Sequence, residues 1–342
     1  MQGTRRVTFG LGLLASDTPD QFVRLVRLAE ERGFSTIWVP DQKFFRECYA
    51  YLTLAAVHTH HVRLATCVTD PYTRHPALTA AAMSTVDEIA GGRGILGIGA
   101  GSSGMGAMGL KRVKPAAAVR EAVEVIRALW RGGSVTATGN LIRFAGAGLD
   151  FTSRADIPVY IAGRGPQILE LAGEIAEGVI IGALASPPTL DYAMRHIQTG
   201  QRRGGRPPGC QEIAIWLHTV LDADGARARD AVRPMVVSVL VSSAPVLDEI
   251  GVVLPDALRA RIEKIPFGIK SGAMQEAAPL VPDDVLEHFT VAGDGAFCRQ
   301  RIAALANAGV AHIAVNPKLT HGQTMEQFVE TFAAEIISPL RA

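Results

Sequence analysis

Segments that look like buried strands alternate with segments of helical periodicity along nearly all of this 342-residue chain. The strand-like segments are short apolar runs, and the helical ones carry apolar residues three and four positions apart. Such alternation implies a parallel sheet with right-handed crossovers. Eight strands in a chain longer than the roughly 250 residues typical of the fold predict an α/β protein, a (β/α)8 TIM barrel with insertions. An open doubly wound sheet is the alternative. The expected strands are residues 7–13, 36–39, 62–66, 94–98, 157–161, 179–181, 213–221 and 312–315.

Two stretches interrupt the alternation. Residues 134–144 alternate around Gly139-Asn140, which predicts a β-hairpin. Residues 243–283 follow the seventh strand and its helix and contain five prolines, so we expect a helical insertion there that could act as a lid. We treat residues 1–342 as one domain. The expected helices are residues 19–32, 48–58, 77–89, 113–130, 166–176, 190–203, 226–241, 295–307 and 324–337.

Charge and cysteine content narrow the functional class. The formal net charge is +1, which offers no electrostatic reason for nucleic acid or an anionic membrane as partner. The four cysteines lack CxxC spacing, so we expect a reducing compartment, no disulfide framework and no metal site. No signal pattern precedes the first strand, and a cytoplasmic protein acting on a small molecule is expected.

The connection after the third strand is dense in polar groups and proline. Residues 66–76 read Thr-Cys-Val-Thr-Asp-Pro-Tyr-Thr-Arg-His-Pro. Pro71 and Pro76 each hold φ near one value and bias the residue before them away from helix, so the loop should be stiff. Because α/β folds bind ligands at the carboxyl ends of strands, this loop predicts a ligand site. A well-capped helix start is the simpler interpretation.

Two glycine-rich loops follow other strands. Gly97–Gly104 matches GxGxxG, but it follows the fourth strand and lacks the acidic residue of a dinucleotide site. We expect Gly101, Ser102 and Ser103 to approach a flat ligand instead. Gly163-Arg-Gly-Pro166 opens a helix whose free N–H groups can bind phosphate, with Arg164 as a further donor. A plain glycine turn is the alternative there.

Taken in order, these motifs resemble those of the bacterial-luciferase-like superfamily, most closely its methylenetetrahydromethanopterin reductase branch. The quoted segments are residues 66–76, Gly94–Gly101, Val113–Pro115, Ile157–Pro166 and Leu171–Gly178. The resemblance implies a TIM barrel, a homodimer, and coenzyme F420 as cofactor, with FMN as the alternative. It also implies transfer of a hydride between the deazaflavin C5 and a small organic substrate.

The resemblance also implies roles for individual residues. The bond Cys67–Val68 matches a non-proline cis peptide that supports the cofactor ring, with Thr69 beside it. Gly163 and Gly165 match the phosphate turn, and Asp41 matches an acidic residue beside the deazaflavin.

Two positions depart from the family pattern. Gln42 replaces a common histidine, and Gly12 replaces the acid of the true pterin reductases, so pterin reduction itself is not expected. Asp41, Gln42 and His75 are our candidate catalytic residues. The alternatives are an FMN-dependent monooxygenase of the same fold and a non-catalytic flavin-binding protein.

Overall fold

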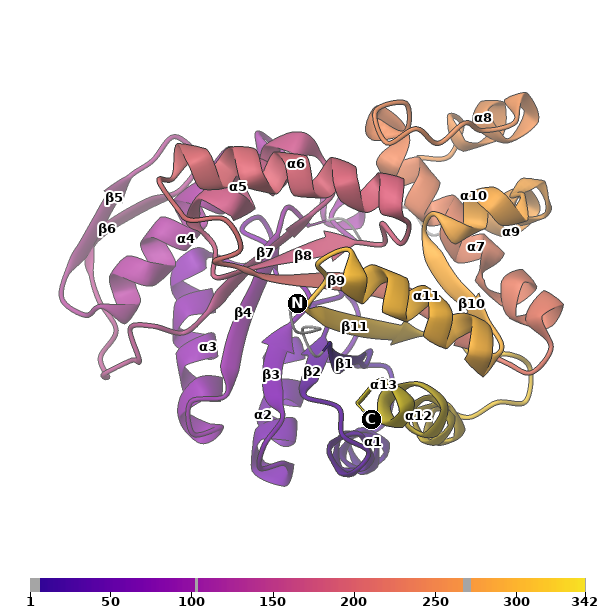
Figure 1. Ribbon diagram of the computed structural model, residues 1–342. Coiled ribbons are helices and arrows are strands. Elements are labelled where there is room, and N and C mark those ends of the chain that lie inside the picture. Colours follow the sequence, from indigo (N-terminus) through magenta and orange to yellow (C-terminus); the bar gives the residue numbers. More distant parts are fainter. Residues whose placement is uncertain (1–6, 102–103, 267–271, 342) are drawn as a thin grey trace.

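Eight parallel strands form a closed barrel in the computed structural model, which describes residues 7–101, 104–266 and 272–341 (Figure 1). Pairing of β8 with β9 and of β11 with β1 completes the ring. The TIM barrel expected from the sequence is therefore confirmed. In order around the barrel the strands are β1 (Thr8–Gly12), β2 (Thr36–Val39), β3 (Arg63–Thr66), β4 (Gly94–Gly99), β7 (Val159–Gly163), β8 (Gly178–Gly182), β9 (Glu212–Leu221) and β11 (His312–Pro317).

Helices surround the barrel and begin where the local sequence favours a helix start. Thr18 caps the first helix in a capping box with Gln21, and a proline occupies the first turn of five of the helices, which matches its fixed φ. The helices around the barrel are α1 (Pro19–Glu31), α2 (Cys48–His58), α3 (Pro76–Ile89), α4 (Pro115–Trp130), α5 (Pro166–Ile175), α6 (Pro187–Arg203), α7 (Gly225–Ser243), α11 (Gly295–Asn307), α12 (Met325–Phe332) and α13 (Ser338–Arg341).

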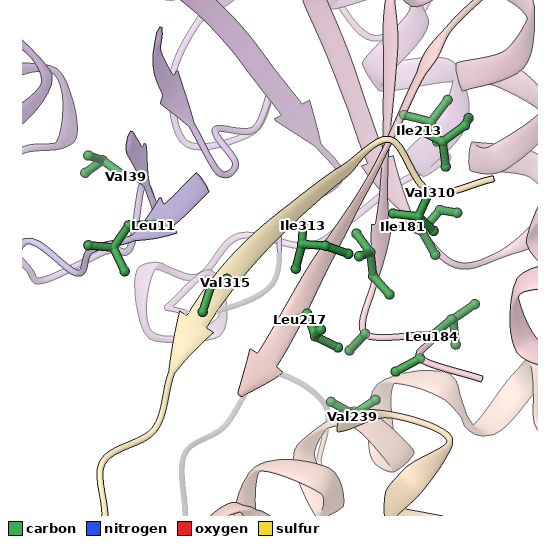
Figure 2. Packing of buried hydrophobic residues seen from close by; sticks show 14 of the residues in the cluster. Leu11, Val39, Ile181, Leu184, Ile213, Leu217, Val239, Val310, Ile313 and Val315 are labelled. Carbon is green, nitrogen blue, oxygen red and sulfur yellow. The ribbon is translucent and has the colours of Figure 1, made fainter. Parts of the chain in front are cut away.

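Alternation along the strands produces two separate apolar layers. One face of each strand packs against the helices, as Leu217 and Val315 do in Figure 2, where Val239 of α7 lies close to Leu217. The other face fills the barrel interior. The interior cluster comprises Trp38, Ala65, Ile95, Tyr160, Ile180, Ala214 and Ala314. The side chain two positions further along each strand points the same way and therefore faces the open end of the barrel.

The sheet contains a ninth strand that the sequence pattern did not predict. β10 (Thr290–Gly293) pairs with residues His218–Leu221 of β9, beyond the part of β9 that pairs with β8. The sequence Thr-Val-Ala-Gly is too short to show a period, and its pairing depends on the ten-residue length of β9.

Two insertions decorate the barrel on different sides (Figure 1). The predicted hairpin consists of β5 (Val135–Thr138) and β6 (Arg143–Ala147). The insertion after β9 and α7 carries three short helices, α8 (Asp256–Ile262), α9 (Ala273–Ala277) and α10 (Asp283–Glu287), of which α9 and α10 lie close to α7. Asp283 pairs with Arg229 of α7 at 2.9 Å and also with Arg233. Among the described residues, no helix has both the length and the apolar character to cross a membrane.

Candidate active site

The carboxyl ends of the eight barrel strands meet at one end of the barrel, which we call the barrel mouth. Chemistry-bearing side chains in this fold project from these strand ends and the loops that follow them. Asp41 follows β2, Cys67 to Thr69 follow β3, and Arg164 follows β7. The sequence predictions at the second, third and fifth strands thus fall on the same end of the barrel.

The peptide bond between Cys67 and Val68 is cis, at the position that the family resemblance indicated. Backbone hydrogen bonds hold this segment on both sides: Cys67 N donates to Val39 O at 2.9 Å, and Thr69 N donates to Gly97 O at 3.0 Å. The side chains of Cys67 and Val68 are half-buried and pack on the interior cluster. Together they form an apolar surface at the mouth on the β3 side.

The glycines of β4 make room for this segment. A Cβ at Gly97 would lie 2.0 Å from Thr66 O, and one at Gly99 would lie 2.9 Å from the Val68 side chain. At Gly101, φ is +66° and a Cβ would lie 2.9 Å from Asp70 Cγ. The Cβ positions of these glycines thus face neighbouring protein atoms, and the approach of this loop to a flat ligand stays a prediction. Ser102 and Ser103 lie outside the described residues.

A lysine that the sequence analysis did not select joins the two acidic groups of the mouth. Lys43 Nζ lies 3.5 Å from Asp41 Oδ1 and 2.9 Å from Asp70 Oδ2. Thr69 Oγ1 donates to Asp41 Oδ2 at 2.8 Å, so two of the predicted cofactor-binding residues contact each other. Burial tends to raise the pKa of Asp70, but the Lys43 charge and hydrogen bonds from Thr73 hold it below its ordinary value. The sequence signal for this lysine was its position two residues after Asp41, in the loop that follows β2.

The other two catalytic candidates occupy different environments. Gln42 Oε1 is buried and has no hydrogen-bond partner among the described residues. A buried acceptor without a donor is costly, so Gln42 is suited to accept a hydrogen bond from a ligand. His75 is exposed, and its Nδ1 accepts from Ala77 N at 3.2 Å as the N-cap of α3. The contacts of His75 thus match the simpler interpretation of a helix cap, and they do not bring it to Asp41.

The loop Gly163–Gly165 leads into α5 with Gly165 as N-cap and without a side-chain cap. The first N–H groups of a helix lack partners within the helix, which makes this end a candidate phosphate site. Arg164, our further candidate donor to phosphate, makes its side-chain hydrogen bonds with α7. Its guanidinium donates to Val239 O at 3.2 Å, Ser242 Oγ at 2.6 Å and Ser243 Oγ at 3.0 Å, at the end of α7. Burial lowers the pKa of Arg164 to about 10.

The side of the mouth formed by β9 and β11 carries polar groups that our sequence analysis missed. Trp216 and His218 share the inward face of β9 with Ala214, and Asn316 shares that of β11 with Ala314. Asn316 Nδ2 lies 3.0 Å from His218 Nδ1. The pKa of His218 is lowered to about 3, first by burial and then by the charges of Lys318 and Arg164. Strand alternation from Ala214 onward was the signal that could have identified this face.

Trp216 fills the space beside Gly12. A Cβ at Gly12 would lie 2.5 Å from Trp216 Cη2. Next to Gly12, a pocket of about 360 Å³ lies between the loops that follow β1 and β11. Its walls include Gly12, Leu14, Asp17, Asn316, Met325 and Glu326. Burial, followed by the charge of Glu326, raises the pKa of Asp17. The volume is within the range of small-molecule sites.

The chain is similar to known proteins along most of its length. A family model described as luciferase-like monooxygenase matches residues 5–312. A 5,10-methylenetetrahydromethanopterin reductase from Methanolobus tindarius is 33% identical over 97% of this chain and 100% of that protein. An F420-dependent glucose-6-phosphate dehydrogenase from Beutenbergia cavernae is 28% identical over 95% of this chain and 94% of that protein.

Solved structures show the same barrel. The coenzyme F420-dependent tetrahydromethanopterin reductase from Methanopyrus kandleri superposes with a TM-score of 0.84 at 31% identity, covering 98% of this chain and 99% of that one. An F420-dependent secondary alcohol dehydrogenase superposes with a TM-score of 0.80 at 22% identity and shares the fold. It covers 98% of this chain and 99% of that one.

Proposed function

Because this chain belongs to the luciferase-like monooxygenase family, we propose that it is an oxidoreductase that uses coenzyme F420. The reaction is transfer of a hydride between the deazaflavin C5 and a small organic substrate. When bound, the cofactor supplies the hydride chemistry, and the protein supplies orientation and exclusion of water. The observation that carries the proposal is the apolar surface of Cys67 and Val68 on the β3 side of the barrel mouth.

The residues around this surface fit a flat, polar-edged ring. Val68 offers an apolar face, while Gln42 Oε1, unpaired among the described residues, offers an acceptor for an N–H group at the edge. Asp41 is held in place by Thr69 and Lys43, so it is a positioned carboxylate beside that edge. The open space at Gly165, before the first turn of α5, would accept the phosphate.

We propose a substrate other than a pterin. Gly12 offers no acid, and Trp216 occupies the space in which a side chain at that position would lie. A missing general acid costs about 10²–10⁴-fold in rate. The mouth is therefore better suited to a substrate that does not need a carboxylic acid from β1.

Titration of the purified protein with F420 and with FMN tests the cofactor. We expect F420 to bind in the micromolar range or tighter, seen as quenching of its fluorescence. Binding of FMN without binding of F420 would instead support the FMN-dependent monooxygenase. Binding of either cofactor without turnover of any substrate would favour a non-catalytic flavin-binding protein.

A substitution at Gly165 tests the phosphate site better than a substitution at Gly163 does. A Cβ at Gly163 would lie 2.1 Å from Ile168 Cγ2, so a substitution there disturbs packing, whereas a Cβ at Gly165 would meet no described atom within 4 Å. Gly165→Asp and Gly165→Asn are matched in shape, and both residues are good N-caps. We expect the aspartate to weaken F420 binding at least about tenfold through charge repulsion, while asparagine has a smaller effect. Equal affinities would place the phosphate elsewhere.

We also propose that residues 1–342 act as one domain, in a homodimer, in the cytoplasm. The family resemblance supports the dimer. Val57 of α2 and Leu78 and Ile89 of α3 are exposed apolar side chains on two neighbouring helices. All four cysteines are free, which suits a reducing compartment. Light scattering of the purified protein would contradict the dimer if it gave the mass of one chain.

A further inference from the structure

The hydrogen bond between Asn316 and His218 determines where the histidine carries its proton. The amide nitrogen of Asn316 can only donate, so the Nδ1 of His218, 3.0 Å away, must accept. A histidine whose Nδ1 accepts is neutral and carries its single proton on Nε2. The His218 side chain is 6% exposed, and burial together with two cations keeps it uncharged near neutral pH. His218 is therefore a neutral Nε2–H donor.

The position of His218 in the barrel directs this donor to the substrate side. β9 is four strands away from β3 in either direction around the ring, so His218 and Trp216 lie across the mouth from Cys67 and Val68. A ring resting on Val68 has its opposite face turned toward β9. Asn316, the partner of His218, also lines the 360 Å³ pocket, so the histidine lies one side chain away from a space large enough for a small substrate.

The charges near His218 indicate which class of substrate the site favours. The two charged groups that act on His218, Lys318 and Arg164, are both cations. A positive field opposes a cationic iminium carbon and stabilises an oxygen on which negative charge develops. Such a charge develops when a hydride adds to the carbon of a C=O group.

Resting on the proposed function, we propose that His218 donates a hydrogen bond from Nε2 to the reacting oxygen of a carbonyl substrate, or of the alcohol in the reverse direction. In this step a hydride moves from C5 of a reduced deazaflavin to the carbonyl carbon. The π pair moves to the oxygen, which takes up one proton from water. The cofactor is oxidised by two electrons and releases one proton. Asn316 acts as the positioning residue that sets the histidine tautomer.

The tautomer can be measured without cofactor or substrate. In the protein labelled with [15N]histidine, two-bond 15N–1H correlations distinguish Nδ1–H from Nε2–H. We expect His218 to carry its proton on Nε2, with its signals assigned by their loss in His218→Gln or in His218→Asn. His312 is an internal reference of opposite type, because Trp38 Nε1 donates to its Nε2 at 3.0 Å. A proton on Nδ1 of His218 would overturn the proposal.

Two substitutions then separate a donor from a structural role. Glutamine can place an amide N–H near the Nε2 position, whereas asparagine can replace only the contact to Asn316. With reduced F420 and acetone, cyclohexanone or benzaldehyde as acceptor, we expect turnover of at least one. His218→Asn should slow hydride transfer by about 10²-fold and His218→Gln by less than about tenfold, with unchanged Kd for F420. His196→Gln on α6 is the matched control and should change neither quantity.

The possible failures are distinguishable. Absence of F420 binding to the wild type would reject the proposed function itself. Binding of F420 with no hydride transfer to any of the three carbonyls would overturn the carbonyl assignment. Equal rates in His218→Asn and His218→Gln would reject His218 as the donor.

Discussion

At the scale of single residues, the mouth is shaped by pairs in which a larger side chain fills the space beside a glycine. Gly12 and Trp216 are the clearest pair, since any Cβ at position 12 meets the outer ring of the indole. Gly99 and Val68 form a second pair at the β3 segment. Such complementarity makes the effect of one substitution depend on its neighbour.

This dependence predicts the outcome of a double-mutant cycle. Gly12→Ala should lower the free energy of unfolding by about 1–3 kcal/mol through overpacking. In the Trp216→Phe background the smaller ring leaves room, and we expect the cost of the alanine to fall by more than half. Urea unfolding of the four proteins measures the coupling. Gly106→Ala, where a Cβ would meet no atom of the described residues within 4 Å, is the control. Additive costs would show that Trp216 moves freely away from position 12.

At the scale of elements, one aspartate connects the turn after β9 to the loop after β11. Asp222 accepts hydrogen bonds from Arg227 Nη2 at 2.6 Å, Thr320 Oγ1 at 2.6 Å and Asp224 N at 2.9 Å. The hydrogen bond from Arg227, with those from Thr320 and Asp224, lowers the pKa of Asp222 to about 2. This connection therefore joins the ends of β9 and β11, the two strands that contain His218 and Asn316.

The lowered pKa predicts how this connection depends on acid. The carboxylate has a lower pKa in the folded than in the unfolded chain, so its contribution is present above about pH 4 and is lost as the pH falls to about 2. Asp222→Asn should lower the free energy of unfolding by about 1 kcal/mol at pH 7, and the difference should shrink below pH 4. Asp230→Asn is the control, because the Asp230 side chain is 74% exposed in its pair with Arg233. A difference that stays constant down to pH 2 would contradict the assignment.

At the scale of the whole molecule, two buried histidines connect stability to pH. The pKa of His312 is lowered to about 3 chiefly by burial, as is that of His218. His312 lies in the barrel interior, where its Nδ1 is 2.8 Å from Thr8 Oγ1. Unfolding exposes both rings, which then bind protons near their ordinary pKa of 6.5.

The unfolded chain thus binds more protons below pH 6.5, so the free energy of unfolding should fall as the pH decreases from 6.5 toward 3. Each histidine contributes about 1.4 kcal/mol per pH unit once its unfolded form is fully protonated. Urea unfolding at pH 7, 6 and 5 should show a slope smaller by about one proton in His312→Gln than in the wild type. Parallel curves would show that His312 is protonated in the folded protein. The exposed His321→Gln is the matched control.

Particular elements show which parts of the fold and of the candidate site the sequence could predict. The period of the apolar residues predicted the eight barrel strands, because alternation of βα units leaves few parallel topologies. β10 escaped prediction, because four residues without a period become a strand only through the length of β9. In the site, the resemblance indicated the Cys67–Val68 bond, and the helix start at Pro76 indicated the cap that His75 forms. The contact of Arg164 with α7 joins distant segments, which local sequence does not reveal.

The sequence by itself determined the barrel and the absence of an acid at position 12, and it predicted the end at which a ligand binds. Those properties depend on local periodicity and on residue identity, both of which can be read along the chain. Only the tertiary structure decided that Lys43 joins Asp41 to Asp70, that Trp216 fills the space at Gly12 and that Asn316 orients His218. Asn316 and His218 are 98 positions apart in the chain, and they meet because barrel closure sets the register of β9 against β11.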